Sequence, residues 1–98
     1  MRVLFRVDAS LEIGNGHVIR CLTLAHALKT IGAQCEFVCR FHKGNLLALI
    51  EQQGFVAHVL PEGSLPTWLG VTWQEDASQT RRLIGTQNYD WLVVDHYD

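Results

Sequence analysis

The chain has 98 residues, a mass of 11.1 kDa and a formal net charge of −2. This length accommodates one small domain, and 48% hydrophobic with 18% charged residues is the composition of a globular protein rather than a disordered one. The weakly acidic balance provides no basic surface, which argues against binding to nucleic acid and against electrostatic attachment to a membrane.

Neither secretion nor a membrane span is expected from the apolar segments. Arg6 and Asp8 cut short the apolar run at residues 3–5, which is far too short for the hydrophobic region of a signal peptide. Uncharged stretches such as residues 21–28 are much shorter than the about 20 apolar residues that cross a bilayer. The three cysteines are too few and too scattered for a disulfide scaffold. We therefore expect reduced thiols in a cytoplasmic protein.

The hydrophobic pattern predicts strands and helices that alternate along the chain. Runs of β-branched and aromatic residues predict strands over residues 3–7, 35–39, 55–60 and 91–94. Apolar residues at helical spacing predict helices over residues 17–28, 45–53 and 75–84. The run at 91–94 is nearly continuous, which is typical of a strand buried on both faces. The alternation predicts an α/β fold with a parallel Rossmann-like sheet of about four strands and helices on both of its faces.

Polar groups follow three of the predicted strands. They are Asp8-Ala9-Ser10 with the loop at Gly14, then Arg40-Phe41-His42, and then Asp95-His96-Tyr97-Asp98. Because ligands of open parallel sheets bind beyond the carboxyl ends of the strands, we expect these groups to converge on one edge. No helix follows the last predicted strand to cover it, so we also expect residues 1–98 to be the first part of a larger domain.

The segment Gly14-Asn15-Gly16 comes immediately before a predicted helix. Glycines allow backbone N–H groups to approach a phosphate, and the helix N-terminus adds about half a positive charge there. An equally good interpretation is a strand-to-helix turn that needs special backbone conformations. The dinucleotide fingerprint fails, because Ile19 replaces its third glycine and Arg40 its acid. The P-loop sequence Gly-Lys-Ser/Thr is absent as well, so we expect no cofactor of either kind.

His17 begins the helix behind this loop. The helix dipole disfavours a cationic imidazole at this position, so the neutral ring can accept a proton as a general base does. Asp8 or Asp95 could orient the ring or hold its water. The alternative is a histidine that caps the helix or bonds to a loop carbonyl. The group Asp95-His96-Tyr97 also has two interpretations, a ligand site after a buried strand or the start of a polar loop.

Other reactive or aromatic residues are expected to be structural. Cys35, Cys39 and His42 have the spacing of metal ligands. However, Cys35 and Cys39 share one face of a predicted strand, so we expect core packing and no metal site. Trp68 and Trp73 are expected to form a hydrophobic plug in preference to a flap over a substrate.

Several segments in combination resemble one enzyme family. They are residues 6–10, 13–25, 37–40, 44–46, 68–71, 73, 75–77 and 91–97. The first two read RVDAS and IGNGHVIRCLTLA, and the last reads WLVVDHY. Over nearly its whole length the chain is similar to the UDP-2,4-diacetamido-2,4,6-trideoxy-β-L-altropyranose hydrolases of pseudaminic acid biosynthesis.

The resemblance implies a two-domain fold of the GT-B type, similar to the N-acetylglucosaminyltransferase of peptidoglycan synthesis, with residues 1–98 as its N-terminal part. It implies an inverting hydrolysis that releases UDP and 2,4-diacetamido-2,4,6-trideoxy-L-altrose, without a metal or cofactor. His17 would be the catalytic base and Tyr97 an active-site tyrosine. The residues implied to bind the UDP-sugar substrate are Asp8, Gly14, Asn15, Gly16, Arg20, Asp95 and His96.

In that family a C-terminal domain holds the uracil and much of the diphosphate, and these 98 residues do not include it. We therefore expect the chain alone to have little or no activity. Two alternatives stay open. One is a truncated, non-catalytic binding or assembly module that self-associates or acts with a partner chain. The other is a glycosyltransferase relative that uses a sugar or lipid acceptor in place of water.

Overall fold

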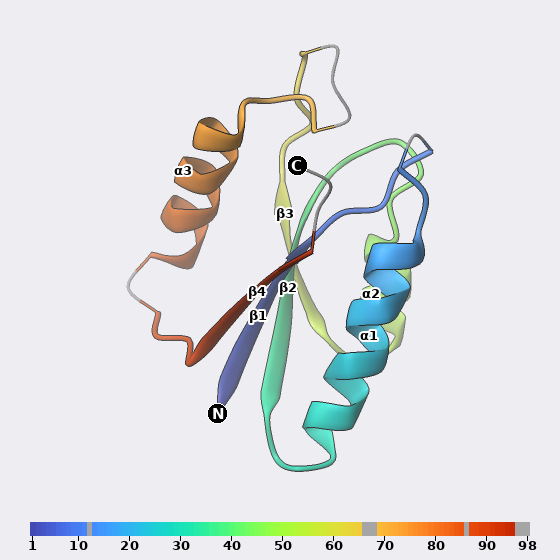
Figure 1. Ribbon diagram of the computed structural model, residues 1–98, viewed down its shortest axis with the longest axis vertical. Helices are drawn as coiled ribbons and strands as arrows, with labels where there is room; N and C mark the ends of the chain where they lie inside the picture. Colours follow the sequence, from blue (N-terminus) through green and yellow to red (C-terminus); the bar gives the residue numbers. More distant parts are fainter. Residues whose placement is uncertain (12, 66–68, 86, 96–98) are drawn as a thin grey trace.

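Strands and helices alternate along residues 1–11, 13–65, 69–85 and 87–95, the residues that the computed structural model describes (Figure 1). In chain order they are β1 (Arg2–Val7), α1 (Gly16–Lys29), β2 (Gln34–Arg40), α2 (Leu47–Gln52), β3 (Val56–Leu60), α3 (Trp73–Ile84) and β4 (Trp91–Asp95). All strand pairs are parallel, and the sheet order is β3-β2-β1-β4. The predicted α/β fold with a parallel Rossmann-like sheet is therefore confirmed. None of the helices in these ranges is both long and apolar enough to cross a membrane.

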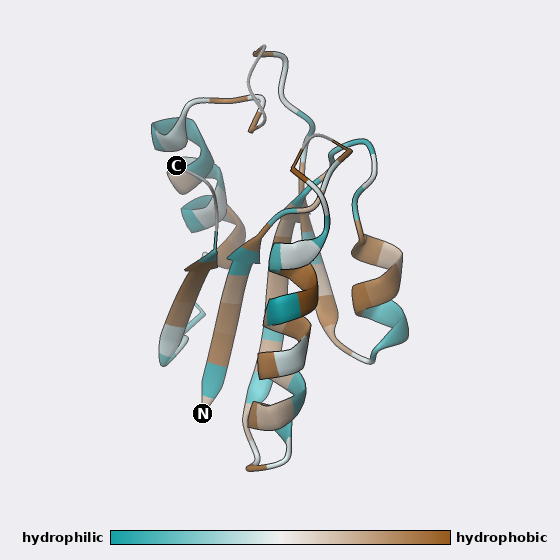
Figure 2. Ribbon diagram, turned by 45° about the vertical axis from the view of Figure 1, so that its right-hand side comes forward, coloured by the Kyte–Doolittle hydropathy of each residue, from teal (hydrophilic) through white to brown (hydrophobic). Residues whose placement is uncertain are grey.

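Helices α1 and α2 cover one face of the sheet and enclose the main core (Figure 1). The odd-numbered residues of β1 and β2 point into this core, as the period of two in a strand requires. Phe5 stacks on Phe37 with ring centroids 4.9 Å apart, and Phe55 packs against Phe37 at 5.7 Å. Figure 2 shows hydrophobic residues along the strands, whereas hydrophobic and hydrophilic residues alternate on α1. Burial of one side of each helix against the sheet stabilises this layer.

Helix α3 lies on the opposite face of the sheet (Figure 1). It packs near a smaller apolar cluster that contains Leu4, Val38 and Leu60. The helix begins at Trp73, before the predicted start at residue 75, because Thr72 caps it. The Thr72 hydroxyl accepts a hydrogen bond of 3.1 Å from the Glu75 amide, which satisfies one of the free donors of the first turn.

Strand β4 is an edge strand with exposed side chains. Trp91, Leu92 and Val94 are 65%, 54% and 59% exposed, so the prediction of a strand buried on both faces is wrong. The reason is the sheet order, which places β4 at the end with β1 as its only strand neighbour among the described residues. The expected plug is also wrong for Trp73, which is 72% exposed. Trp68 lies outside the described residues.

The three thiols are free and buried. Cys35 and Cys39 are 8% and 3% exposed and belong to the main core, which confirms their predicted packing role. Cys21 of α1 lies in the same core. All three are therefore on the side of the sheet that α1 and α2 cover.

A backbone hydrogen bond joins the loops that follow β1 and β2. The Leu11 amide donates a hydrogen bond of 2.9 Å to the Lys43 carbonyl oxygen. Gly44 lies against this contact with a φ of +84°, and a Cβ atom on it would lie 2.8 Å from the Leu11 nitrogen. Glycine satisfies both the backbone conformation and the lack of space. The contact fixes the start of the segment that leads from β1 to α1.

We predict that Gly44→Ala destabilises the fold more than Gly32→Ala does. Gly32 also has a positive φ, +90°, but a Cβ atom there would meet nothing within 4 Å. Its substitution should cost about 1–2 kcal/mol for the backbone conformation alone. Gly44→Ala should cost about 1–3 kcal/mol more, because the methyl group displaces Leu11. Urea unfolding followed by far-UV circular dichroism measures both, and equal losses would contradict the proposed backbone contact.

Candidate functional site

The carboxyl ends of the strands bring the predicted site residues to one edge of the sheet, in two clusters. Asp95, at the end of β4, contacts His17 and Arg20 of α1. Asp8, just after β1, contacts Arg6 and the backbone at the end of β2. The two aspartates that sequence reasoning offered as partners of His17 are thus distinguished, since Asp95 is the one bonded to its ring. The predicted site residues His96 and Tyr97 lie outside the described residues.

His17, Arg20 and Asp95 form a tight polar cluster between α1 and β4. The Nδ1 atom of His17 lies 2.8 Å from Asp95 Oδ1. Arg20 donates to both carboxylate oxygens, with Nε 3.0 Å from Oδ2 and Nη2 2.7 Å from each oxygen. His17 and Asp95 are mostly buried at 15% and 18% side-chain exposure, whereas the Arg20 side chain is 68% exposed. The cluster is therefore reachable from solvent on the Arg20 side.

The contacts of His17 fix the tautomer of its neutral ring. An ionised carboxylate only accepts hydrogen bonds, so His17 Nδ1 must carry the proton that it donates to Asp95. Arg20 Nη2 lies 3.2 Å from the same Nδ1 but is itself only a donor, so this approach is not a hydrogen bond. The lone pair of the ring is consequently on Nε2. A histidine oriented by a carboxylate through Nδ1 is the arrangement of a general base.

Asp95 is held in its ionised form. Partial burial raises the pKa of its carboxyl, but the hydrogen bonds and charges of Arg20 and His17 outweigh that effect and hold the pKa below its usual value. An anionic Asp95 stabilises positive charge on His17 once the ring accepts a proton. Arg20 offsets part of this effect, because its guanidinium already neutralises the same carboxylate.

The neighbouring thiol of Cys21 is not a nucleophile. Its Sγ atom lies 3.7 Å from Asp95 Oδ2. Burial, followed by the negative charge of Asp95, raises the pKa of this thiol to about 12. The thiol is therefore protonated near neutral pH and acts as a weak donor to Asp95, whereas nucleophilic catalysis by cysteine needs the thiolate.

The two glycines around the start of α1 fit different interpretations, one as part of a turn and the other as open space for a ligand. Gly14 has a φ of +77° and exchanges backbone hydrogen bonds with Ser10, so it serves the turn itself. Gly16 has no positive φ, and a Cβ atom on it would meet nothing within 4 Å. Asn15 is the N-cap residue of α1, yet its side chain makes no capping hydrogen bond. The first turn of the helix therefore receives no cap from the Asn15 side chain, and Gly16 leaves open space beside it, which is compatible with an anionic group.

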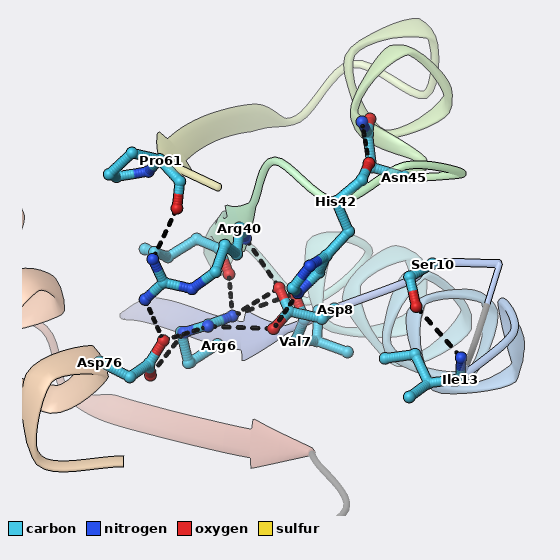
Figure 3. Close-up of polar contacts among 11 residues, drawn as sticks. Arg6, Val7, Asp8, Ser10, Ile13, Arg40, His42, Asn45, Pro61 and Asp76 are labelled. Atoms are coloured by element: carbon cyan, nitrogen blue, oxygen red, sulfur yellow. Dashed lines mark hydrogen bonds and ion pairs between the residues drawn. The ribbon is translucent and has the colours of Figure 1, made fainter. Parts of the chain in front are cut away.

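The second cluster lies between the sheet and α3, and we call Arg6, Asp8, Arg40, His42 and Asp76 the buried charge cluster (Figure 3). Each of these residues is at most 6% exposed. Arg6 bonds both oxygens of Asp8 at 2.8 and 3.0 Å and both oxygens of Asp76 at 2.5 and 3.1 Å. Arg40 shares Asp76 through Nη2, while its backbone amide donates to Asp8 Oδ1 at 2.7 Å. The cluster ties α3 to the ends of β1 and β2.

The sequence predicts that Asp8, Arg40 and His42 meet at this edge, but it does not identify Arg6 and Asp76 as members of the cluster. In the sequence Arg6 only interrupts an apolar run, and Asp76 is only part of the predicted helix over residues 75–84 and of the motif resemblance. The signal that could have found the cluster is Arg6 within the mostly apolar β1, together with Arg40 directly after the apolar residues 37–39 of β2. A buried arginine needs an acidic partner, and α3 provides one in Asp76.

The cationic groups of the buried charge cluster lower the pKa values of its two aspartates. Burial alone would raise the pKa of the Asp8 carboxyl, but His42, the Arg6 guanidinium and the Arg40 amide together hold it well below its usual range. Burial would likewise raise the pKa of Asp76, and the two arginines lower it. Asp8 is 1% exposed, so its carboxylate acts within the protein at this edge.

The residues with metal-ligand spacing do not form one group. Cys35 and Cys39 face the main core, whereas His42 Nε2 lies 3.4 Å from Asp8 Oδ2 on the other side of the sheet edge. Across residues 1–11, 13–65, 69–85 and 87–95, no three His, Cys, Asp or Glu side chains are grouped so that they could hold a metal ion.

We predict that Asp76→Asn strongly destabilises the protein. The substitution keeps the shape of the side chain but leaves the buried guanidinium groups of Arg6 and Arg40 with one carboxylate between them. The expected loss is about 3–5 kcal/mol of unfolding free energy, measured by urea unfolding. Glu62→Gln, which removes an exposed carboxylate nearby, is the control and should change stability by about 0.5 kcal/mol or less. Equal effects of the two variants would contradict the role of Asp76.

Stability should fall in acid at a pH that the aspartates determine. The pKa values of Asp8, Asp76 and Asp95 are lower in the folded state than in an unfolded chain. Their contribution is therefore complete above the unfolded value of about 3.9 and is lost as the pH falls below it toward the folded values. Urea unfolding at pH 7, 5, 3 and 2 tests this, with little change from these groups down to pH 5 and a progressive loss below pH 4. Undiminished stability at pH 2 would show that these carboxylates are not ion-paired in solution.

Comparisons with known proteins add no identification to this geometry. The sequence matches no model of a known protein family. A search of curated proteins likewise finds no significant match. The function is therefore argued from the site and from the sequence motifs.

Proposed function

We propose that the chain is the N-terminal part of an inverting UDP-sugar hydrolase in which His17 is the general base that activates water. The substrate would be UDP-2,4-diacetamido-2,4,6-trideoxy-β-L-altropyranose, and the product sugar would enter pseudaminic acid biosynthesis in the cytoplasm. The observation that carries the proposal is the hydrogen bond of 2.8 Å between His17 Nδ1 and Asp95 Oδ1 at the carboxyl edge of the sheet. The motif resemblance around His17 supplies the substrate class.

In the proposed reaction, His17 assists a single displacement at the anomeric carbon of the substrate. Water attacks the anomeric carbon from the face opposite the leaving group, and His17 Nε2 takes the proton that the water loses. The bond between the anomeric carbon and the diphosphate oxygen breaks, and its electron pair leaves with UDP, so the anomeric centre inverts. Asp95 stabilises the imidazolium that forms, in the same way as the carboxylate of other base-histidine pairs.

The leaving diphosphate needs stabilisation of negative charge more than it needs a proton. In the proposal, the backbone N–H groups at the start of α1, which the Asn15 side chain does not cap, take that role next to Gly16. The Arg20 guanidinium would add a positive charge one turn further along the same helix. In the same scheme Tyr97 and His96, which follow Asp95 in the sequence, would contact the sugar.

The proposal includes a C-terminal domain that binds the uracil and completes the cleft. The exposed apolar side chains of Leu92 and Val94 line a pocket beside α3, so they favour further covering of that face of the sheet and are not part of the cleft at His17. Without such a domain most of the nucleotide-binding energy is missing and water is not excluded from the site. We therefore expect little or no hydrolysis by the 98 residues alone.

The test is UDP release from this UDP-sugar by the protein as its native host produces it. His17→Ala should lower kcat by about 10²–10⁴-fold, because general-base catalysis is lost. His26→Ala is the matched control, since His26 is an exposed histidine of the same helix that bonds to Gln53. It should leave the rate unchanged. Far-UV circular dichroism of both variants establishes that they are folded.

Three other results would contradict the proposal. UDP release that is unchanged in His17→Ala would remove the general base from the mechanism. Release that requires an added sugar or lipid acceptor would identify a transferase instead. No release from the host-produced protein, combined with tight binding to a second chain, would identify a non-catalytic assembly module.

A further inference from the structure

Two hydrogen-bond donors share one oxygen of Asp95 in its cluster with His17 and Arg20. The Nδ1 atom of His17 lies 2.8 Å from Asp95 Oδ1, and Arg20 Nη2 lies 2.7 Å from the same oxygen. The two nitrogens are 3.2 Å apart and both carry hydrogen, so their contact is unfavourable. It becomes a contact between two cations once His17 accepts a proton. This arrangement therefore opposes the charge that the proposed general base has to take up.

Arg20 is the donor that can move away. Its side chain is 68% exposed, whereas the His17 side chain is 15% exposed between α1 and β4. Ion pairs with a solvent-exposed partner contribute little, because water replaces the contact at small cost. If Arg20 leaves, Asp95 Oδ1 keeps its hydrogen bond from His17, and Oδ2 keeps the weak contact of 3.7 Å with the Cys21 thiol. The departure therefore leaves neither carboxylate oxygen without a donor.

A phosphate group at the start of α1 would offer Arg20 a second anionic partner. Arg20 lies about one turn after Gly16 in α1, and helical side chains lean toward the N-terminus of their helix. The first turn has no cap from the Asn15 side chain, and a Cβ atom on Gly16 would meet nothing within 4 Å. The planar fork of a guanidinium fits two phosphate oxygens as well as it fits a carboxylate. A diphosphate carries more negative charge than one carboxylate, so it would compete with Asp95 for Arg20.

We propose that Arg20 changes partners when the substrate binds, leaving Asp95 for the diphosphate, so that Asp95 then supports His17 alone. This inference rests on the proposed function, from which it takes the identity of the anion. Arg20 acts through Asp95 as a positioning residue for the base, in addition to its contact with the diphosphate. When His17 takes the proton from water, the imidazolium then has the whole charge of Asp95 to itself. Substrate binding and the strength of the base are therefore coupled, and release of UDP returns Arg20 to Asp95.

The experiment is a titration with UDP of the ¹³C,¹⁵N-labelled protein as its native host produces it. NMR follows the Nε–H signal of Arg20 and the side-chain carboxylate signal of Asp95, which is assigned by its loss in Asp95→Asn. We expect both signals to shift together, because one contact breaks as the other forms. Uridine, which has no phosphate, should shift neither signal. UDP is the product of the proposed reaction, so the readout requires no hydrolysis.

Two variants separate the change of partner from the general effect of an added negative charge. In Arg20→Gln the Asp95 signal should lie, before any UDP is added, near the position that the wild type reaches at saturation. UDP should then hardly move it, and it should bind at least about 10-fold more weakly, because a charge-assisted contact is lost. Arg82→Gln is the matched control, since Arg82 is an exposed arginine of α3. It should give the same shifts and the same affinity as the wild type.

Three results would overturn the change of partner. A shifted Arg20 signal with an unmoved Asp95 signal would show that Arg20 contacts both anions at once. Equal shifts of the Asp95 signal in the wild type and in Arg20→Gln would show only the electric field of the diphosphate. No shift of either signal would show that Arg20 stays on Asp95.

Failure of the proposed function has a different signature. If both signals shift but the protein releases no UDP from the UDP-sugar, the change of partner stands and the hydrolase proposal is wrong. If UDP release depends on His17 while the Asp95 signal does not move, the hydrolase proposal stands and the change of partner is wrong.

Discussion

Two guanidinium groups, those of Arg6 and Arg40, are buried between the sheet and α3, and the fold can hold them there only with carboxylates in contact. Asp76 meets both arginines and Asp8 meets Arg6, so two positive and two negative charges share one dry volume. Removing four ions from water is costly, and the many hydrogen bonds between them offset this cost. The position of α3 on the sheet, and with it the connection from β3, therefore depends on this cluster more than on apolar packing, which on this face is small.

The same edge of the sheet gives two aspartates different roles. Asp8 is surrounded by protein and fixes backbone, whereas Asp95 contacts a histidine and an exposed arginine at the surface. The alternation of side chains along the strands explains the difference. Asp8 follows β1 with the same parity as Arg6, which faces α3, while Asp95 has the parity of Val93, which packs against the α1 side. In this sheet, the face on which the carboxylate emerges decides whether it is enclosed by protein, as Asp8 is, or contacts α1 near the surface, as Asp95 does.

Local patterns in the sequence were sufficient for the strands, the helices and the presence of helices on both faces of the sheet. The shared strand face of Cys35 and Cys39 predicted that both pack in the core, and the position of His17 at the start of α1 followed from the glycine loop. What local patterns could not predict is strand order, because it is decided by contacts between distant segments. The edge position of β4 is such a case, and a continuous apolar run was therefore misinterpreted as a doubly buried strand.

Long-range pairing explains the rest of what sequence reasoning missed. Arg6 and Asp76 are 70 residues apart, and nothing in the surroundings of Asp76 distinguishes it from an acid that favours a helix N-terminus. The choice of Asp95 over Asp8 as the partner of His17 is similar, since both aspartates end strands that neighbour each other in the sheet. In each case the residue type was visible, and only the topology determined its partner.

The distribution of the cysteines has a practical consequence. Cys21, Cys35 and Cys39 all lie in the layer between the sheet and helices α1 and α2, and burial raises the pKa of each thiol. Cys21 and Cys39 are each 3% exposed, so alkylating reagents reach them only when that layer opens, whereas Cys35 lines a pocket at the surface. Labelling kinetics would follow the fluctuations of this half of the molecule, while the half that α3 covers would be invisible to them. The reactivity of the native thiols therefore reports local opening on only one side of the sheet, and no engineered label is needed.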